Sequence, residues 1–258
     1  MNEILKVIDQ RRSTRTYAET PITEQEKALI LNAAYRAPTA GNMMLYSIID
    51  VTDPIIKERL VETCDDQPFI AKAPLVLVFL ADYQRWWDYY NLCRAQDRAS
   101  ELGVTNRKPQ AGDLLLACCD ALIAAQNTVI AAESLGIGSC YIGDVMENYE
   151  IHQELFNLPQ YVFPIGMLCY GRPVQTETQR HRVPRYDPEF MTFENRYQRL
   201  DDAALTRMYA SNNERLFAQG QPVQGALNFG QHNYLRKFTA EFSFEMSRSV
   251  EKMLENWQ

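Results

Sequence analysis

The sequence predicts a layered domain of the α+β or α/β class. Two short amphipathic helices come first, about four short apolar strands then alternate with helices, and a long helical tail follows. With 258 residues, of which 46% are hydrophobic, the chain can bury one large core, alone or with an elaborated subregion. This pattern sets the class of fold but not the order of the strands.

The predicted elements of the first third follow from periodicity and capping. Apolar residues at helical spacing predict a helix over residues 3–10. Thr23 and Glu26 form a capping box that begins a second helix, which Pro38 ends. A turn over residues 38–42 precedes a strand over 46–51, a helix over 54–63 and a fully buried strand over 74–80.

Residues 82–111 break this rhythm. The segment is aromatic, charged and rich in turn residues, which predicts a partly helical excursion that ends in a loop. Its aromatic side chains, which we expect to pack on the domain or to form an interface or the roof of a pocket, are Trp86, Trp87, Tyr89 and Tyr90.

The longest apolar stretch covers residues 114–135. We expect Asp113 to cap this helix and Gly136 to end it. The helix is apolar on nearly every side, so the sequence predicts burial on every face, either in the core of one chain or at a dimer interface. Polar residues such as Asp120 and Glu133 argue against a membrane span.

The second half continues with a strand and turn over residues 138–145, a helix over 147–157 and a buried strand over 163–170. A polar, proline-punctuated segment spans residues 174–198. Two helices are expected over residues 200–218 and 231–256.

Composition excludes several classes of function. The net charge of −7 argues against a nucleic-acid partner. We find no signal-peptide pattern at the N-terminus. Six cysteines without a C-x-x-C motif and three separated histidines predict reduced thiols, no metal site and a cytoplasmic location.

A basic cluster stands at the start of this acidic chain. Arg11, Arg12 and Arg15 flank two hydroxyl residues, a combination that suits an anion with several oxygens. A solvated basic turn is the alternative. The sequence lacks a Rossmann fingerprint, a P-loop and common hydrolase motifs, so these do not explain the cluster.

Four short segments follow one another along the chain: R-R-S-T-R, P-T-A-G-N, L-G-I-G-S-C-Y-I-G-D and G-R-P. Together with the late basic stretch over residues 180–184, they resemble the FMN-dependent nitroreductase family. The branch is that of oxygen-insensitive NADPH nitroreductases and NADPH-flavin reductases. The resemblance implies an α+β fold with a central mixed sheet flanked by helices, and a homodimer with the long helix at its interface. It runs through residues 3–200, which we predict as an FMN-binding core; residues 201–258 are a helical extension of the same domain.

The resemblance also implies which residues hold FMN. The residues that match those binding the FMN phosphate are Arg11, Arg12, Ser13, Arg180 and Arg182. Arg15 and Gln67 match residues at the pyrimidine edge of the flavin ring. Two further segments match cofactor contacts: the turn Thr39, Ala40, Gly41 and Asn42, which reaches across the dimer, and Tyr141, Ile142, Gly143 and Asp144, whose backbone approaches flavin N5. Asp144 departs from the family, where a second glycine is frequent.

The implied activity is that of an NAD(P)H oxidoreductase in which the flavin does the chemistry and no side chain serves as nucleophile. NAD(P)H and a small-molecule acceptor share one pocket, which predicts ping-pong kinetics. The expected nucleotide-binding loop, residues 218–230, contains no Lys or Arg, so we expect weak discrimination between NADH and NADPH or a preference for NADH. Alternatives are a dehalogenating or flavin-fragmenting enzyme of the same fold, or a non-catalytic flavin-binding module.

Overall fold

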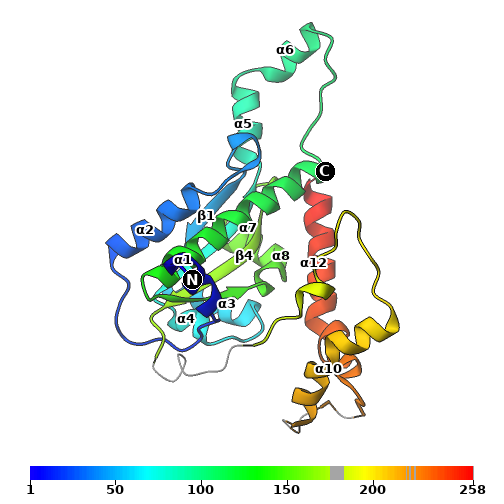
Figure 1. Cartoon of the computed structure of the whole chain (residues 1–258). Coiled ribbons are helices and arrows are strands. Elements are labelled where there is room, and N and C mark those ends of the chain that lie inside the picture. Colours follow the sequence, from blue (N-terminus) through cyan, green and yellow to red (C-terminus); the bar gives the residue numbers. More distant parts are fainter. Residues whose placement is uncertain (175–182, 219, 221, 224, 258) are drawn as a thin grey trace. The chain divides into compact units, whose positions relative to one another are not determined.

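The computed structural model describes residues 1–174, 183–218, 220, 222–223 and 225–257. The chain forms two compact units, which are treated separately below (Figure 1). The first comprises residues 1–180 and 245–258, and the second comprises residues 181–244. The expected division into a core of residues 1–200 and an extension of residues 201–258 stays a prediction.

A four-stranded sheet organises the first unit. Its strands are β1 (Tyr46–Asp50), β2 (Leu75–Asp82), β3 (Gly138–Ile142) and β4 (Val162–Gly171). They pair in the order β1-β2-β4-β3, and every pair is antiparallel. The order therefore places the last strand in sequence inside the sheet. All eight residues of β2 are buried, as the uninterrupted apolar run predicts.

Helices cover both faces of this sheet. Alternate residues of β2 point to opposite sides, so Val76, Val78 and Leu80 join one apolar cluster while Leu75, Leu77 and Phe79 join another. The elements that supply the rest of these clusters and of the surrounding surface are α1 (Glu3–Gln10), α2 (Glu24–Tyr35), α3 (Pro54–Thr63), α4 (Phe69–Lys72), α7 (Ala111–Ser134), α8 (Tyr149–Leu155) and the short turns η1 (Ala40–Asn42) and η2 (Asp144–Met146).

Helix α7 packs on all four strands and on α2. It begins with a capping box in which Gln110 is the N-cap and Asp113 the third helical residue, so the expectation that Asp113 is the N-cap is wrong. Among the described helices, α7 alone is long and apolar enough to span a membrane by length and composition. One face of this helix packs on the sheet and on α2.

One chain does not bury α7 on every face. Small residues such as Ala121, Ala124 and Ala125 face the sheet and are fully buried. The opposite face exposes large apolar side chains: Leu115, Leu116, Leu122 and Ile123 are between 41% and 68% exposed. Of the two expected ways to bury this helix, the core of a single chain is therefore excluded.

The excursion consists of α5 (Gln84–Leu92) and α6 (Ala95–Glu101), joined at Arg94, followed by a loop. Trp86, Trp87 and Tyr90 are half-buried against the apolar cluster at this end of the sheet, whereas Tyr89 is exposed. Packing on the domain thus accounts for three of the four aromatic side chains.

The last helix, α12 (Glu241–Trp257), returns to the first unit from residue 245 onward. Met253 and Trp257 are almost completely buried, and the Trp257 ring meets Tyr161 and Phe163 edge to face. This helix completes the apolar cluster at one end of the sheet.

The second unit is built from aromatic contacts between helices. It contains η3 (Pro188–Phe190), α10 (Asp202–Ala218), α11 (Phe229–Asn233) and the π-helical turn η4 (Tyr234–Phe238). Tyr209 of α10 contacts Tyr186 and stacks on Phe229. The expected continuous helix over residues 231–256 is wrong, because the chain leaves helical hydrogen bonding at Thr239 and Ala240.

Candidate functional site

The basic cluster lies beside the edge strand β3. Ser13 and Ser139 form a parallel bridge, and the Thr14 N–H donates to the Ser139 carbonyl over 2.9 Å. Further along, Tyr17 bridges Pro173 and the Ala18 N–H donates to the Arg172 carbonyl. The backbone of residues 13–18 is therefore anchored to β3 and to the end of β4, which fixes where the arginines begin.

Two glycines make this close approach possible. A Cβ on Gly138 would overlap the buried Thr14 side chain, with 2.8 Å to its Cβ. A Cβ on Gly171 would likewise overlap the Tyr17 ring, with 2.7 Å to Cγ. The glycines of the L-G-I-G-S-C-Y and G-R-P segments thus serve packing of the N-terminal segment against the sheet.

Charged groups from separate segments converge on the middle of β3. Burial is the main cause of the raised pKa of the Cys140 thiol. Arg15, Ser13 and Arg11 act in the opposite direction, and Asp144 raises this pKa further. Three residues of the basic cluster and the carboxylate that follows β3 therefore affect the pKa of one buried thiol.

Arg11 and Arg15 form no ion pair with any described residue. The Arg15 guanidinium lies 5.8 Å from the centre of the Phe69 ring, and the side chain is exposed. On α7, burial raises the pKa of the Glu133 carboxyl to about 7 despite the opposing effect of Arg11 and Arg12. In the part of the chain that the structure describes, the Arg11 and Arg15 cations thus have no carboxylate bound to them.

The structure joins Gln67 to Asp144. The Gln67 Nε2 atom donates to the Cys64 carbonyl over 2.9 Å and to Asp144 Oδ2 over 2.7 Å. The two residues before it, Asp65 and Asp66, have left-handed φ values of 60° and 49°. A tight turn therefore delivers the Gln67 amide to the end of β3.

The segment from Tyr141 to Asp144 presents its residues in different ways. Tyr141 is half-buried, and burial raises its pKa to about 12. The Ile142 side chain is buried in the core, so only its backbone faces outward. Gly143 is exposed, and a Cβ there would have no heavy atom within 4 Å. Open space therefore borders the chain immediately before Asp144.

The turn of Thr39, Ala40, Gly41 and Asn42 belongs to a different part of the surface. The Ala40 N–H donates to Asp120 Oδ1 over 2.9 Å, and the Leu45 N–H donates to Asp120 Oδ2 over 3.1 Å. No hydrogen bond or ion pair within the described residues links this turn to the basic cluster, Gln67 or Asp144. One chain does not bring these two groups of predicted site residues together. Arg180 and Arg182 lie outside the described residues.

Two of the buried carboxyl groups, Asp120 and Glu147, bear on the site although neither was among the predicted site residues. Asp120, 2% exposed, holds the turn over residues 39–42; an acid in the middle of an apolar stretch was the available signal. Glu147, 4% exposed, has an Oε1 atom that is buried without a hydrogen bond. Burial, Asp144, Asp65 and Glu245 raise the pKa of Glu147 to about 7. No sequence pattern marks Glu147.

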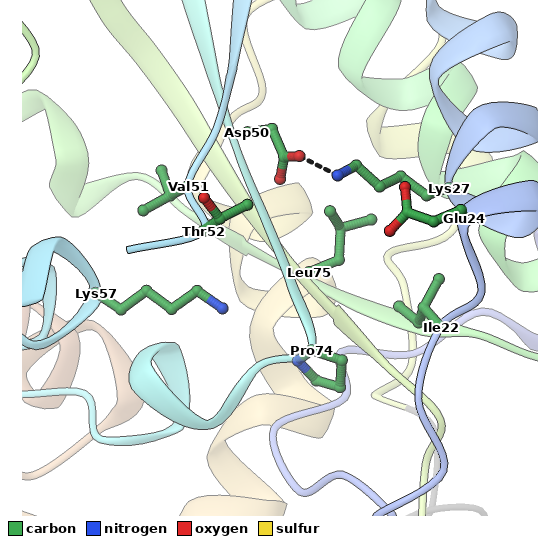
Figure 2. Close-up of a pocket in the computed structure, with 9 residues that line it drawn as sticks. All are labelled: Ile22, Glu24, Lys27, Asp50, Val51, Thr52, Lys57, Pro74 and Leu75. Carbon is green, nitrogen blue, oxygen red and sulfur yellow. Dashed lines mark ion pairs between the residues drawn. The ribbon is translucent and has the colours of Figure 1, made fainter. Parts of the chain in front are cut away.

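Two pockets lie near this region. A pocket of about 540 Å³ is lined by residues 15–19 together with Pro68, Phe69, Lys72 and Pro74, so it adjoins Arg15. A smaller pocket of about 170 Å³ contains none of the predicted site residues (Figure 2). Figure 2 shows Lys27 and Asp50 joined as an ion pair across its upper part, with the Lys57 amine pointing in from the opposite side. In the described residues no group of three His, Cys, Asp or Glu side chains is placed to hold a metal ion.

Comparison with known proteins identifies relatives over most of the chain. The nitroreductase family model matches residues 8–172. An oxygen-insensitive NADPH nitroreductase of Salmonella typhimurium is 33% identical over 207 residues, 80% of each chain. An FMN reductase [NAD(P)H] of Bacillus subtilis is 32% identical over 72% of each chain. The crystal structure of nitroreductase A from Vibrio parahaemolyticus is 26% identical, covers 98% of each chain and superposes with a TM-score of 0.78.

Proposed function

Because the chain belongs to the nitroreductase family, we propose that it is an FMN-dependent NAD(P)H oxidoreductase that passes two electrons to a small-molecule acceptor. The observation that supports particular residues is geometric: Ser13 bridges Ser139 of β3, and Gln67 donates a hydrogen bond to Asp144 just after the end of the same strand. The names of the relatives, which include nitroreductases and FMN reductases, support the same cofactor and electron donor. No comparison favours a dehalogenating, flavin-fragmenting or non-catalytic protein.

The residues present fit FMN. No carboxylate of the described residues binds the Arg11 guanidinium, and with Arg12 and Ser13 it offers charge-assisted and neutral donors to a phosphate. We propose that Arg180 and Arg182 complete the phosphate site. Arg15 and Gln67 would hold the pyrimidine edge of the ring, and residues 141–144 would border its reactive side. When bound, FMN supplies the atom that accepts and donates hydride.

The protein's own contribution is positioning and electrostatics. The exposed Arg15 cation favours negative charge on a ring beside it, and thereby the reduced cofactor. The open space at Gly143 leaves room for a ligand close to the backbone. Donor and acceptor would use this space in turn, so double-reciprocal plots should give parallel lines; intersecting lines would contradict a shared pocket.

We propose that the protein is a homodimer. The support is the apolar face of α7, on which Leu115, Leu116, Leu122 and Ile123 are exposed in one chain. In the dimer the turn over residues 39–42 would reach the partner's FMN site. This agrees with the lack of any hydrogen bond, within the described residues, between the turn and the basic cluster of its own chain. All six cysteines are free thiols, which is typical of a reducing compartment, and we propose a cytoplasmic location.

An absorption spectrum of the purified protein tests the function. We expect flavin bands that bleach when NADH or NADPH is added without oxygen and return when a quinone or nitroaromatic compound is added. The variant Arg15→Gln should retain the fold and lose bleaching rate. A protein that stays colourless after incubation with FMN would contradict the proposal.

A further inference from the structure

Gln67 has a defined donor and acceptor orientation. An NH₂ group has two hydrogens, and here one goes to the Cys64 carbonyl and the other to Asp144 Oδ2. Both partners are acceptors. A flipped amide would place Gln67 Oε1 against these two oxygens, which repel it, so the orientation is defined. The remaining polar atom, Gln67 Oε1, accepts no hydrogen bond from any described residue. The side chain therefore presents an acceptor to its surroundings.

Asp144 is the side-chain partner that helps to fix the orientation of the Gln67 amide. Its carboxylate lies 77 positions away in sequence and bonds Gln67 at 2.7 Å, within the range of a charge-assisted bond. Asp65 and Asp66, which directly precede Gln67, have left-handed backbone conformations that set the direction in which the chain enters Gln67. A glycine at position 144 would leave one Gln67 hydrogen unpaired and only the Cys64 carbonyl to orient the amide.

The donor and acceptor pattern matches one class of ligand edge. The pyrimidine edge of an oxidised flavin carries one N–H donor, N3–H, between two carbonyl acceptors. Arg15 offers only donors, and Gln67 as oriented offers an acceptor. The two side chains are complementary to an edge of that composition, and they come from segments that meet at Phe69.

The carboxylate also changes the charge of the open space beside Gly143. Asp144 directly follows the exposed Gly143, and its carboxylate is held by the Gln67 amide. Within the described residues no cation forms an ion pair with Asp144. An acceptor entering beside Gly143 therefore meets a carboxylate that no described cation binds.

We propose that Asp144 is a positioning and specificity-determining residue: it turns the Gln67 carbonyl toward the N3–H of the bound flavin, and it biases the site against anionic electron acceptors. This inference rests on the proposed function. It adds to it a role for a residue at which this chain departs from the glycine expected from the family.

The positioning role is tested by binding, without turnover. The probes are FMN and 3-methyl-FMN, which lacks the N3–H, titrated into the apoprotein of each variant. We expect the wild type to prefer FMN about tenfold, the loss of one well-formed hydrogen bond. Asp144→Asn keeps an acceptor for Gln67 and should retain this preference. Asp144→Ala should reduce the preference to about twofold or less, and Asp144→Gly serves if the alanine variant does not fold.

The charge role is tested with neutral and anionic acceptors of one shape, 4-nitrobenzamide and 4-nitrobenzoate. We expect Asp144→Asn to raise the ratio of kcat/KM for the anion over the neutral compound by roughly 3- to 10-fold. Asp66→Asn removes the same charge from the neighbouring turn without touching Gln67, and should leave the FMN preference unchanged and move the acceptor ratio less.

The outcomes separate the two levels of inference. If the wild type binds neither flavin, the proposed function fails. If the wild type binds FMN and Asp144→Ala keeps the full preference over 3-methyl-FMN, the positioning role is overturned. An unchanged acceptor ratio in Asp144→Asn overturns the charge role.

Discussion

Glu147 shows how the protonation of a single residue affects the stability of this protein. The carboxyl is almost completely buried, and its pKa rises from the usual 4.5 to about 7. At pH values below 4.5 the group is protonated in both the folded and the unfolded chain, so its burial has no electrostatic cost. Between pH 4.5 and about 7 the unfolded chain ionises this carboxyl while the folded protein keeps it protonated, so the free energy of unfolding falls across this range and levels off above it.

We therefore expect Glu147→Gln to stabilise the protein more at pH 8 than at pH 5. The difference in the free energy of unfolding should be on the order of 1–3 kcal/mol. Denaturant unfolding at both pH values measures it. Glu251→Gln, which removes an exposed carboxyl of α12, should show no such difference between the two pH values. Equal effects of Glu147→Gln at pH 5 and pH 8 would contradict a titrating buried group.

A second expectation at this scale concerns Gly138. Its replacement by Ala forces Thr14 away from β3 and should lower the free energy of unfolding by about 1–3 kcal/mol. FMN affinity should fall as well, because the basic cluster follows the same backbone. Gly112→Ala is the control: no atom lies within 4 Å of the new methyl group, and helix α7 should gain stability. If both variants had the same melting temperature, close packing at Gly138 would not matter.

The residues of the candidate site illustrate what a sequence can reveal. Arg11, Ser13 and Arg15 stand out because three guanidiniums and two hydroxyls are clustered in an acidic chain. The contact between Gln67 and Asp144 joins positions 77 apart, and local patterns carry no information about such a contact. Glu147 looks like any surface glutamate in the sequence, because its burial comes from the surrounding fold.

Among the elements, α12 and the short helix α8 form one hydrogen-bonded assembly. Ser249 Oγ accepts from the Tyr149 N–H over 3.0 Å and donates to the Met146 carbonyl over 2.6 Å. Glu245 accepts from the Asn148 N–H, and Arg248 binds Glu150 through both carboxylate oxygens. Hydrogen bonds from α12 thus hold the chain just after the turn that starts at Asp144.

Ser249→Ala should loosen that turn. Two buried backbone groups lose their partner, and we expect a cost of about 2–4 kcal/mol in the free energy of unfolding. Hydrogen exchange should quicken in residues 143–150 more than in β2. Ser134→Ala, which removes an exposed hydroxyl bonded only within its own helix, should leave these rates unchanged. Uniform exchange changes throughout the first unit would argue against a local role.

The loop that follows α10 carries the expectation on nucleotide choice. Residues 218–230 contain no Lys or Arg, so the 2′-phosphate of NADPH lacks an evident cation there. We expect kcat/KM for NADH to equal or exceed that for NADPH. Introducing Lys at Leu227, which is 77% exposed, should shift the ratio toward NADPH. A strong preference of the wild type for NADPH would contradict the expectation.

The predicted elements match the structure where periodicity is strong. The capping box at Thr23 and the buried strands are present at or close to the expected residues. The prediction failed at Thr239 and Ala240, where helical propensity continues but the hydrogen-bonding pattern changes after a π-helical turn. Likewise, Asp113 acts from the third helical position, because Gln110 already serves as the cap of α7.

For the whole molecule, the apolar face of α7 predicts association. Leu116→Glu and Leu122→Glu place charges where an interface would exclude water, and each should convert the dimer to a monomer at micromolar concentration. Sedimentation velocity measures the change, and FMN should be lost with it. Ile55→Glu, a substitution at a 77% exposed residue of α3, should leave the dimer intact. A wild type that sediments as a monomer would overturn the proposed assembly.

The docking of α12 has a consequence for synthesis on the ribosome. The Trp257 indole N–H donates to the Gln110 carbonyl, a partner 147 residues earlier in the chain. At 5–20 residues per second, roughly 7–30 s pass between the translation of these two residues. Tyr161 and Phe163 are translated within this interval, and from then until Trp257 is made they have no indole ring to cover them. The nascent chain is therefore a natural client for chaperones that shield apolar surface until the last helix emerges.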